Sequence, residues 1–251
     1  MICLKRTLTA MLTLLVATAM AVLRAAPAEP QAEIQIGLCA AANEIVQALD
    51  LRPSGAPITV WQFDDSALML YGRGLRLRLR VAADGRSVLT LKVANQHCAQ
   101  LDPALTPAPG EGKCEYDVYG ESASGTISLD VRLGERSTSD LLAGRVALAQ
   151  VLSPAQLKYL RAVDGFWPLP SGIRALGPMH VQGYRTKGRK YDIDVSRLPG
   201  GERYAEISRK APLADATQIR AAMEADLSRA GIPICADQSS QAANKLRALL
   251  K

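Results

Sequence analysis

The strongest constraint on the fold of this chain is a run of alternating leucine and arginine, Leu75 to Arg80. Successive side chains of a β-strand point to opposite faces, so this run presents a cationic face opposite an aliphatic one. The cationic face carries three guanidinium groups: Arg76, Arg78 and Arg80. The pattern predicts a strand with one basic and one apolar face.

A second strand of the same design follows at residues 87–92. Its alternation places Thr90 and Lys92 on the face opposite its leucines, and the Asp84-Gly85 dipeptide before it is typical of a tight hairpin turn. The two strands therefore predict a hairpin with a basic wall backed by an apolar wall. Taken alone, such a hairpin is also compatible with a half-exposed sheet whose arginines lie in water.

The alternation recurs along the chain, in acidic strands as well as basic ones. Further strand patterns cover residues 32–37, 58–63, 114–120, 126–134, 180–185, 189–195 and 203–210. Helical patterns cover residues 38–51, 139–152, 153–163, 215–231 and 241–251. About eight strands closed into a barrel would turn their charged faces inward beneath a coat of helices. Because charges removed from water cost several kcal/mol each, such an interior must be wet, mutually paired, or occupied by a charged ligand and metal.

The N-terminus has the composition of a secretory signal peptide over residues 1–28. A basic start precedes an uncharged apolar run, and small residues near Ala26 to Ala28 provide an exit for cleavage. The alternative is an uncleaved membrane anchor, which would be the chain's only route to a membrane. Removing the leader takes away Lys5, Arg6 and Arg24 and no acid, so the formal charge falls from +6 to +3. We expect an exported, periplasmic or secreted protein whose residues 29–251 form one domain.

Four cysteines remain after removal of the leader, which in an exported chain suggests two disulfides. Three pairings are possible, and we favour Cys98 with Cys114, around a turn-rich loop, and Cys39 with Cys235. The alternative for any of them is a buried free thiol. No cysteine has the spacing of a metal site.

The ordered set of strands resembles the triphosphate tunnel metalloenzymes, also called the CYTH superfamily. The resemblance rests on the segments EIQIG from Glu33, QFDDSALML from Gln62, LRLRLR from Leu75, LTLK from Leu89, EYD from Glu115, Arg185 and EIS from Glu206. It implies an α+β fold, an eight-stranded antiparallel β-tunnel (barrel) with a charged interior and helices packed outside. Gln35, Gly37 and Ser208 depart from the family pattern, and two of these departures remove acids.

The resemblance also implies a site that binds phosphates and a divalent metal. The phosphate-binding candidates are Arg76, Arg78, Arg80, Lys92, Arg185 and Lys210. The metal-binding candidates, for Mg²⁺ or Mn²⁺, are Glu33, Glu115, Asp117 and Glu206, with Asp192 or Asp194 as possible assistants. A guanidinium group can donate two parallel hydrogen bonds to phosphate oxygens. The anion-binding half of the family pattern is complete, whereas the loss of acids leaves fewer candidates for the metal-binding half. The acids could instead pair with the tunnel cations as a network without ligand.

Three functions follow, and no catalytic residue is assigned. The first is a metal-dependent phosphohydrolase acting on tripolyphosphate or a nucleoside triphosphate, and the second is a non-catalytic periplasmic module holding a phosphorylated small molecule, polyphosphate or another anion. The third is an exposed-face β protein that docks on acidic envelope surfaces, which predicts no pocket. Export and the scarcity of aromatic residues argue against nucleic acid, and only His97 and His180 are available for histidine chemistry. The ligand, the metal and the oligomeric state stay open.

Overall fold

The computed structural model describes residues 29–102, 105–108, 110–162, 167–238 and 241–251. The predicted signal peptide lies outside the described residues. The strands are β1 (Gln31–Leu38), β2 (Arg52–Pro53), β3 (Ile58–Asp64), β4 (Leu75–Val81), β5 (Ser87–Gln96), β6 (Gly112–Tyr119), β7 (Ser122–Leu133), β8 (Arg174–Arg185), β9 (Asp192–Arg197) and β10 (Arg203–Pro212).

The α-helices among the described residues are shorter than the sequence patterns predict, because turns divide or end several of those patterns. They are α1 (Ala42–Ala48), α2 (Met69–Gly72), α3 (Glu135–Leu142), α4 (Leu148–Val151), α5 (Pro154–Ala162), α6 (Ala216–Arg229) and α7 (Gln241–Ala248). None of the helices in the described ranges has both the length and the apolar character needed to cross a membrane.

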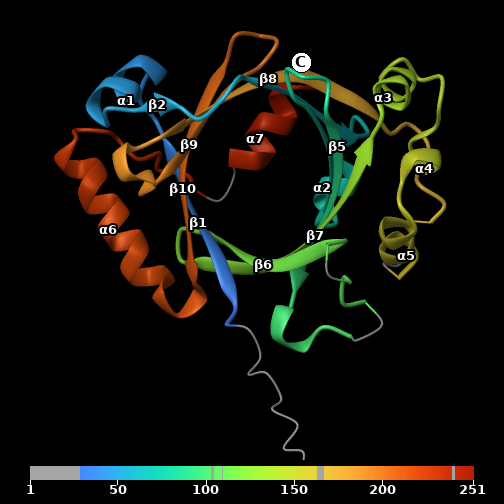
Figure 1. Cartoon of the computed structure of the whole chain (residues 1–251), viewed down its shortest axis with the longest axis horizontal. Helices are drawn as coiled ribbons and strands as arrows, with labels where there is room; N and C mark the ends of the chain where they lie inside the picture. Colours follow the sequence, from blue (N-terminus) through green and yellow to red (C-terminus); the bar gives the residue numbers. More distant parts are fainter. Residues whose placement is uncertain (1–28, 103–104, 109, 163–166, 239–240) are drawn as a thin grey trace, which may run out of the picture.

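The strands form a closed barrel, as predicted (Figure 1). The order of hydrogen-bonded neighbours is β8-β3-β4-β5-β7-β6-β1-β10-β9, and pairing of β9 with β8 closes the ring, while β2 lies beside β8. Within the described residues the ring has nine strands, one more than predicted. β1 and β6 pair in parallel, and every other neighbouring pair is antiparallel.

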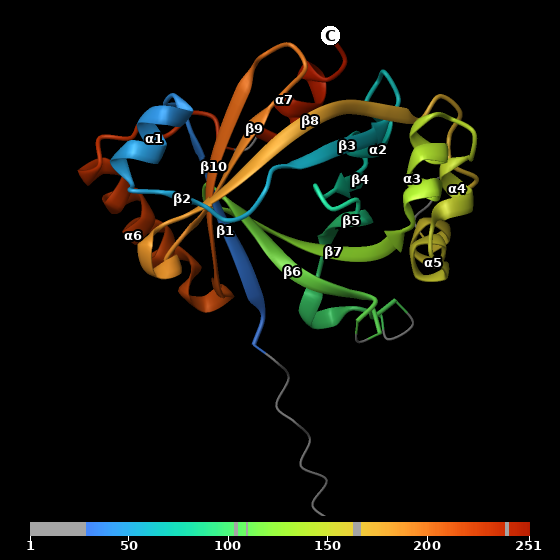
Figure 2. The same cartoon turned by 45° about the horizontal axis from the view of Figure 1, so that its top comes forward.

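The hydrophobic core lies outside the barrel, between the sheet and the helices. The leucines of β4 and β5 are at most 1% exposed and pack with the helices α3, α4 and α5. On the opposite flank, isoleucines of β1, β9 and β10 pack with α1 and α6. Figures 1 and 2 show these helices on two flanks of the barrel. Burial of the aliphatic faces therefore turns the alternating polar residues inward.

One part of the inner wall is apolar, which differs from the predicted charged interior. Val60 of β3 and Met179 and Val181 of β8 are buried in a third apolar cluster, against Ala248 and Leu249 at the end of α7. Helix α7 projects within the ring in the view of Figure 1 and lies towards one end of the barrel in Figure 2, whereas the predicted coat of helices describes α1 and α3 to α6. The apolar stripe on β3 and β8 supplies the surface on which α7 packs.

Both predicted disulfides are confirmed. Cys39 and Cys235 have Cα atoms 4.9 Å apart, and their bond joins the end of β1 to the segment after α6. Cys98 and Cys114 have Cα atoms 5.5 Å apart and join the turn after β5 to β6. Two disulfides indicate an oxidising, extracytoplasmic compartment.

Candidate anion-binding tunnel

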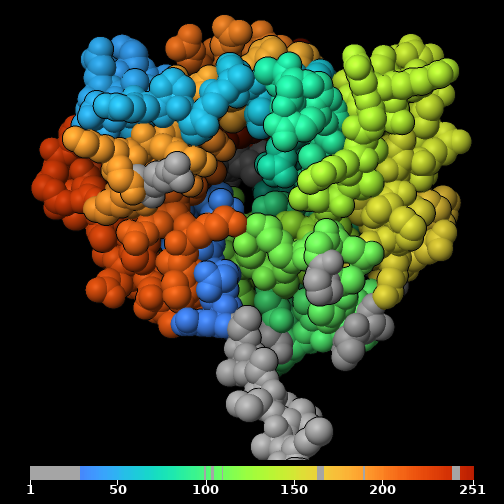
Figure 3. All heavy atoms as spheres, viewed as in Figure 1, coloured from blue at the N-terminus to red at the C-terminus, as the bar shows by residue number. Residues whose placement is uncertain are grey.

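The barrel encloses a cavity of about 550 Å³. In the space-filling view of Figure 3 the molecule is hollowed at the centre of the ring. Its charged lining residues, among those that the structure describes, are Glu33, Arg76, Arg78, Arg80, Lys92, Lys113, Glu115, Asp130, Asp194, Glu206, Lys210 and Lys245. The cavity is therefore lined by charges of both signs, with cations in the majority.

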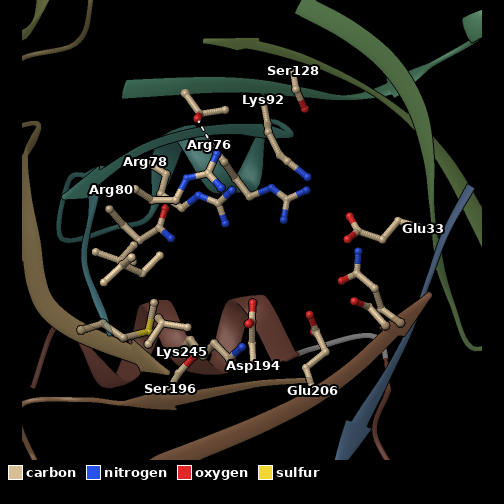
Figure 4. A pocket seen from close by; sticks show the side chains of 18 of the residues that line it. Glu33, Arg76, Arg78, Arg80, Lys92, Ser128, Asp194, Ser196, Glu206 and Lys245 are labelled. Atoms are coloured by element: carbon tan, nitrogen blue, oxygen red, sulfur yellow. Dashed lines mark hydrogen bonds between the residues drawn. The ribbon is translucent and has the colours of Figure 1, made fainter. Parts of the chain in front are cut away.

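The cationic wall consists of Arg76, Arg78 and Arg80 on β4 and Lys92 on β5, and we keep this name below. These four side chains point into the cavity from one side (Figure 4). Strand pairing places Arg76 opposite Lys92. The wall forms because the leucines between its arginines are buried under α3 to α5, which leaves the arginines only the inner face.

Arg78 lies at the centre of this wall without enough compensating charge. Burial, together with the neighbouring guanidinium groups of Arg80 and Arg76, lowers the pKa of Arg78 to about 10. Burial also lowers the pKa of Lys92, although the Asp117 carboxylate opposes this effect. An anion bound here would relieve the repulsion between the cations.

A hydrogen-bonded chain orients the third arginine. The Nη2 atom of Arg80 donates to the hydroxyl of Thr90 at 3.1 Å, and that hydroxyl donates to Oδ1 of Asp130 at 2.6 Å. Asp130 thus acts on Arg80 through Thr90, which is only 1% exposed. This contact sets the direction of the guanidinium before any ligand arrives.

Two of the predicted metal ligands are held by tunnel cations. Asp117, whose side chain is 5% exposed, lies 3.1 Å from Arg76 and 3.5 Å from Lys92. Glu115 lies 2.6 Å from Lys113 and 3.0 Å from Lys210. Burial opposes the charge of Glu115, but hydrogen bonds from these two lysines outweigh it and lower its pKa.

The other two predicted metal ligands, Glu33 and Glu206, line the cavity with Asp194. Glu206 lies directly opposite Asp194 in the pairing of β10 with β9. Burial raises the pKa of Glu206, and the carboxylates of Asp194 and Glu33 add to that effect. Burial likewise raises the pKa of Asp194. These carboxylates repel one another.

The arrangement does not fit a divalent metal. In the described part of the chain, no three histidine, cysteine, aspartate or glutamate side chains gather closely enough to hold a metal ion. The departures from the family pattern explain the deficit, since Gln35 lines the cavity where an acid would stand and pairs in register with Ser208. The neutral side chains of Gln35 and Ser208 therefore stand between the two remaining glutamates, Glu33 and Glu206.

Arg185 is the predicted phosphate ligand that the structure does not bring to the cavity. It lies at the end of β8, is exposed, and pairs with Asp192 at 2.9 Å. Lys210 does line the cavity, although its ammonium group is engaged by Glu115.

Sequence reasoning missed several lining residues. The parity of β6 would have found Lys113, two residues before Glu115, whereas nothing in the helical pattern of α7 marks Lys245 as a tunnel residue. Tyr119, at the end of β6, also lines the cavity. Its burial opposes ionisation and raises its pKa, which keeps the phenol neutral.

Comparison with known proteins supports the fold alone. No family model matches the chain, and no curated protein matches it. Among solved structures, HpAC1 from Hippeastrum, provisionally named an adenylyl cyclase and described as having a dominant triphosphatase activity, aligns with a TM-score of 0.56 and 17% identity over 84% of this chain and 92% of that one. A protein from Bacillus halodurans provisionally named an adenylate cyclase aligns with a TM-score of 0.53 and 14% identity over 85% of this chain and 97% of that one. The chain therefore has the tunnel fold that its sequence resembles.

Proposed function

We propose that this protein binds a phosphate-rich anion of the triphosphate or polyphosphate class inside its tunnel. The observation that carries the proposal is the partly buried cationic wall, where Arg78 keeps its charge although desolvation and two neighbouring arginines oppose it. Such a wall is costly when empty and favourable when an anion fills it. The triphosphatase activity described for HpAC1, which shares the fold, supports the choice of ligand class.

The spacing of the wall suits an extended anion. Alternate residues of a strand are about 6.5 Å apart, so three guanidinium groups follow one another along β4. Each guanidinium can donate two parallel hydrogen bonds to phosphate oxygens. Linked phosphoryl groups carry charge along their length and can meet several of these groups, whereas a compact monoanion can meet few.

The cavity argues against the exposed-face alternative. The arginines line an enclosed space, and the surface that would dock on an acidic envelope is turned inward. Between hydrolysis and binding without turnover, the dispersed carboxylates favour binding, because the described residues do not gather a metal-ligand set. We propose residues 1–28 as a signal peptide and residues 29–251 as the exported, periplasmic or secreted tunnel domain, which the two disulfides support.

The test is calorimetric binding of tripolyphosphate to the purified protein in EDTA and in Mg²⁺ or Mn²⁺, with phosphate release followed in parallel. Arg78→Met removes the central cation, and Arg132→Met removes an exposed arginine of β7 as the matched control. We expect binding that Arg78→Met weakens at least tenfold and Arg132→Met leaves unchanged. Absence of binding under all conditions, or equal binding by both variants, would refute the proposal. Metal-dependent phosphate release that Arg78→Met abolishes would identify a hydrolase.

A further inference from the structure

Helix α7 reaches the tunnel through its apolar side. Leu246 is 4% exposed, and both it and Leu249 line the cavity. Ala248 and Leu249 pack on the apolar stripe formed by Val60, Met179 and Val181. The contact fixes α7 against the cavity at one end of the barrel (Figures 1 and 2).

This contact brings one cation of α7 to the acidic side of the tunnel. Lys245 is partly buried and lines the cavity, and its Nζ lies 6.0 Å from the centre of the Tyr204 ring. Tyr204 precedes Glu206 by two residues on β10, so both belong to the same face of that strand. Figure 4 shows Lys245 beside Asp194, across the cavity from the cationic wall.

The carboxylate pair lies on the same side of the cavity as Lys245. Asp194 and Glu206 are cross-strand neighbours, whose Cβ atoms in such a pair are about 5 Å apart. Lys245 lines the same cavity as both carboxylates, and Figure 4 shows it next to Asp194. Asp117 and Glu115 form ion pairs with other cations of the tunnel. Lys245 therefore faces the pair formed by Asp194 and Glu206.

We propose that Lys245 supplies the positive charge opposite the Asp194 and Glu206 pair that a divalent metal would otherwise provide, so that the tunnel takes its anion without a metal. The inference rests on the proposed anion binding and adds an internal counter-ion to it. The helix holds Lys245 against Tyr204, and the ammonium and a divalent cation compete for the same two carboxylates.

The test measures binding of Mn²⁺ by electron paramagnetic resonance, a readout that does not depend on activity. Lys245→Met keeps the aliphatic stem of the side chain and removes the charge. Lys251→Met is the matched control, since Lys251 is exposed and pairs with Glu202 outside the cavity. Lys245→Arg restores a cation at the same position, and thermal unfolding verifies that each variant is folded.

We expect weak Mn²⁺ binding by the unmodified protein, by Lys251→Met and by Lys245→Arg, and binding at least tenfold tighter by Lys245→Met. Adding Glu206→Gln to Lys245→Met should remove the gain, because one carboxylate of the pair is lost. Equal Mn²⁺ affinity in the unmodified protein and Lys245→Met, including no binding by either, would overturn the inference.

Tripolyphosphate titrations distinguish failure of this inference from failure of the proposed function. Binding by the unmodified protein in EDTA at an affinity unchanged by Mn²⁺ agrees with both. Binding that occurs only with Mn²⁺ leaves the proposed function intact and overturns the role of Lys245. No binding in either condition overturns the proposed function. The comparison of Mn²⁺ affinity between the unmodified protein and Lys245→Met still decides whether Lys245 keeps a divalent cation from the carboxylate pair.

Discussion

Arg78→Met should stabilise the ligand-free protein while weakening its hold on the anion. Arg78 lies between Arg76 and Arg80 on one face of β4, and burial with these two neighbours lowers its pKa to about 10. A lowered pKa means that the folded tunnel opposes the charged form that the unfolded chain carries freely. Methionine fills much of the same space without that charge.

The magnitude follows from the pKa. Each pKa unit corresponds to about 1.4 kcal/mol, so the full shift from an arginine in water amounts to roughly 3 kcal/mol. Water in the cavity screens part of this repulsion, and the lost hydrogen bonds and stem contacts subtract more, which leaves a gain of about 1 to 2 kcal/mol. For a domain of this size the gain raises Tm by roughly 2 to 8 °C.

Thermal unfolding followed by circular dichroism, with and without tripolyphosphate, measures both effects. The Arg132→Met control should unfold within about 2 °C of the unmodified protein, because exposed substitutions change stability by about 0.5 kcal/mol or less. Tripolyphosphate should raise the Tm of the unmodified protein and of the control, and much less that of Arg78→Met. If Arg78→Met unfolds well below the control without ligand, the arginine stabilises the empty tunnel and the reasoning about stored repulsion is wrong.

Three further changes test other parts of the tunnel. Asp117→Asn removes the counter-ion of two partly buried cations, Arg76 and Lys92. Urea unfolding should therefore show a loss of roughly 3 kcal/mol, and calorimetry should show tighter tripolyphosphate binding. Unchanged values of both would contradict the assigned ion pairs. Replacing Cys39 and Cys235 together by serine opens a loop closed over a sequence separation of 196 residues. The free energy of unfolding should fall by about 3 to 5 kcal/mol in the same assay. A smaller loss would mean that strand pairing alone holds β1 in place. Burial raises the pKa of Glu206 above its value in the unfolded chain, so its charge destabilises the fold at high pH. Glu206→Gln should therefore raise Tm at pH 8, and this gain should vanish below about pH 4, where the carboxyl is protonated in both states. A gain in Tm that does not depend on pH would exclude this cause.

Local alternation made the walls of the tunnel predictable. The period of two in Leu75 to Arg80 determines which side chains share a face, and burial of the leucines decides that the arginines turn inward. Both disulfides were also predicted from the sequence, because four cysteines in a chain expected to be exported allow three pairings, of which the turn-rich loop between Cys98 and Cys114 favoured one. The alternation of the strands depends on neighbours in sequence alone.

The ring's details depend on pairing between distant strands. β1 pairs in parallel with β6 and antiparallel with β10, an arrangement that no local pattern specifies. The same long-range pairing sends Arg185 to the exposed end of β8, although its place in the ordered motifs predicted a phosphate ligand. The order of motifs along the chain identifies each strand. The position of a side chain along the barrel axis depends on the register in which that strand pairs with its neighbours.

The sequence by itself determined the two-faced strands and the residues of the cationic wall, because each follows from residue type and local spacing. It left three cysteine pairings open, and the favoured one is present. Only the tertiary structure decided which charges meet. It paired Asp117 and Glu115 with tunnel cations and set Asp194 against Glu206. It also packed α7 against the cavity and brought Lys245 to the side of that pair, because contact with the apolar stripe on β3 and β8 removes apolar surface of the helix from water.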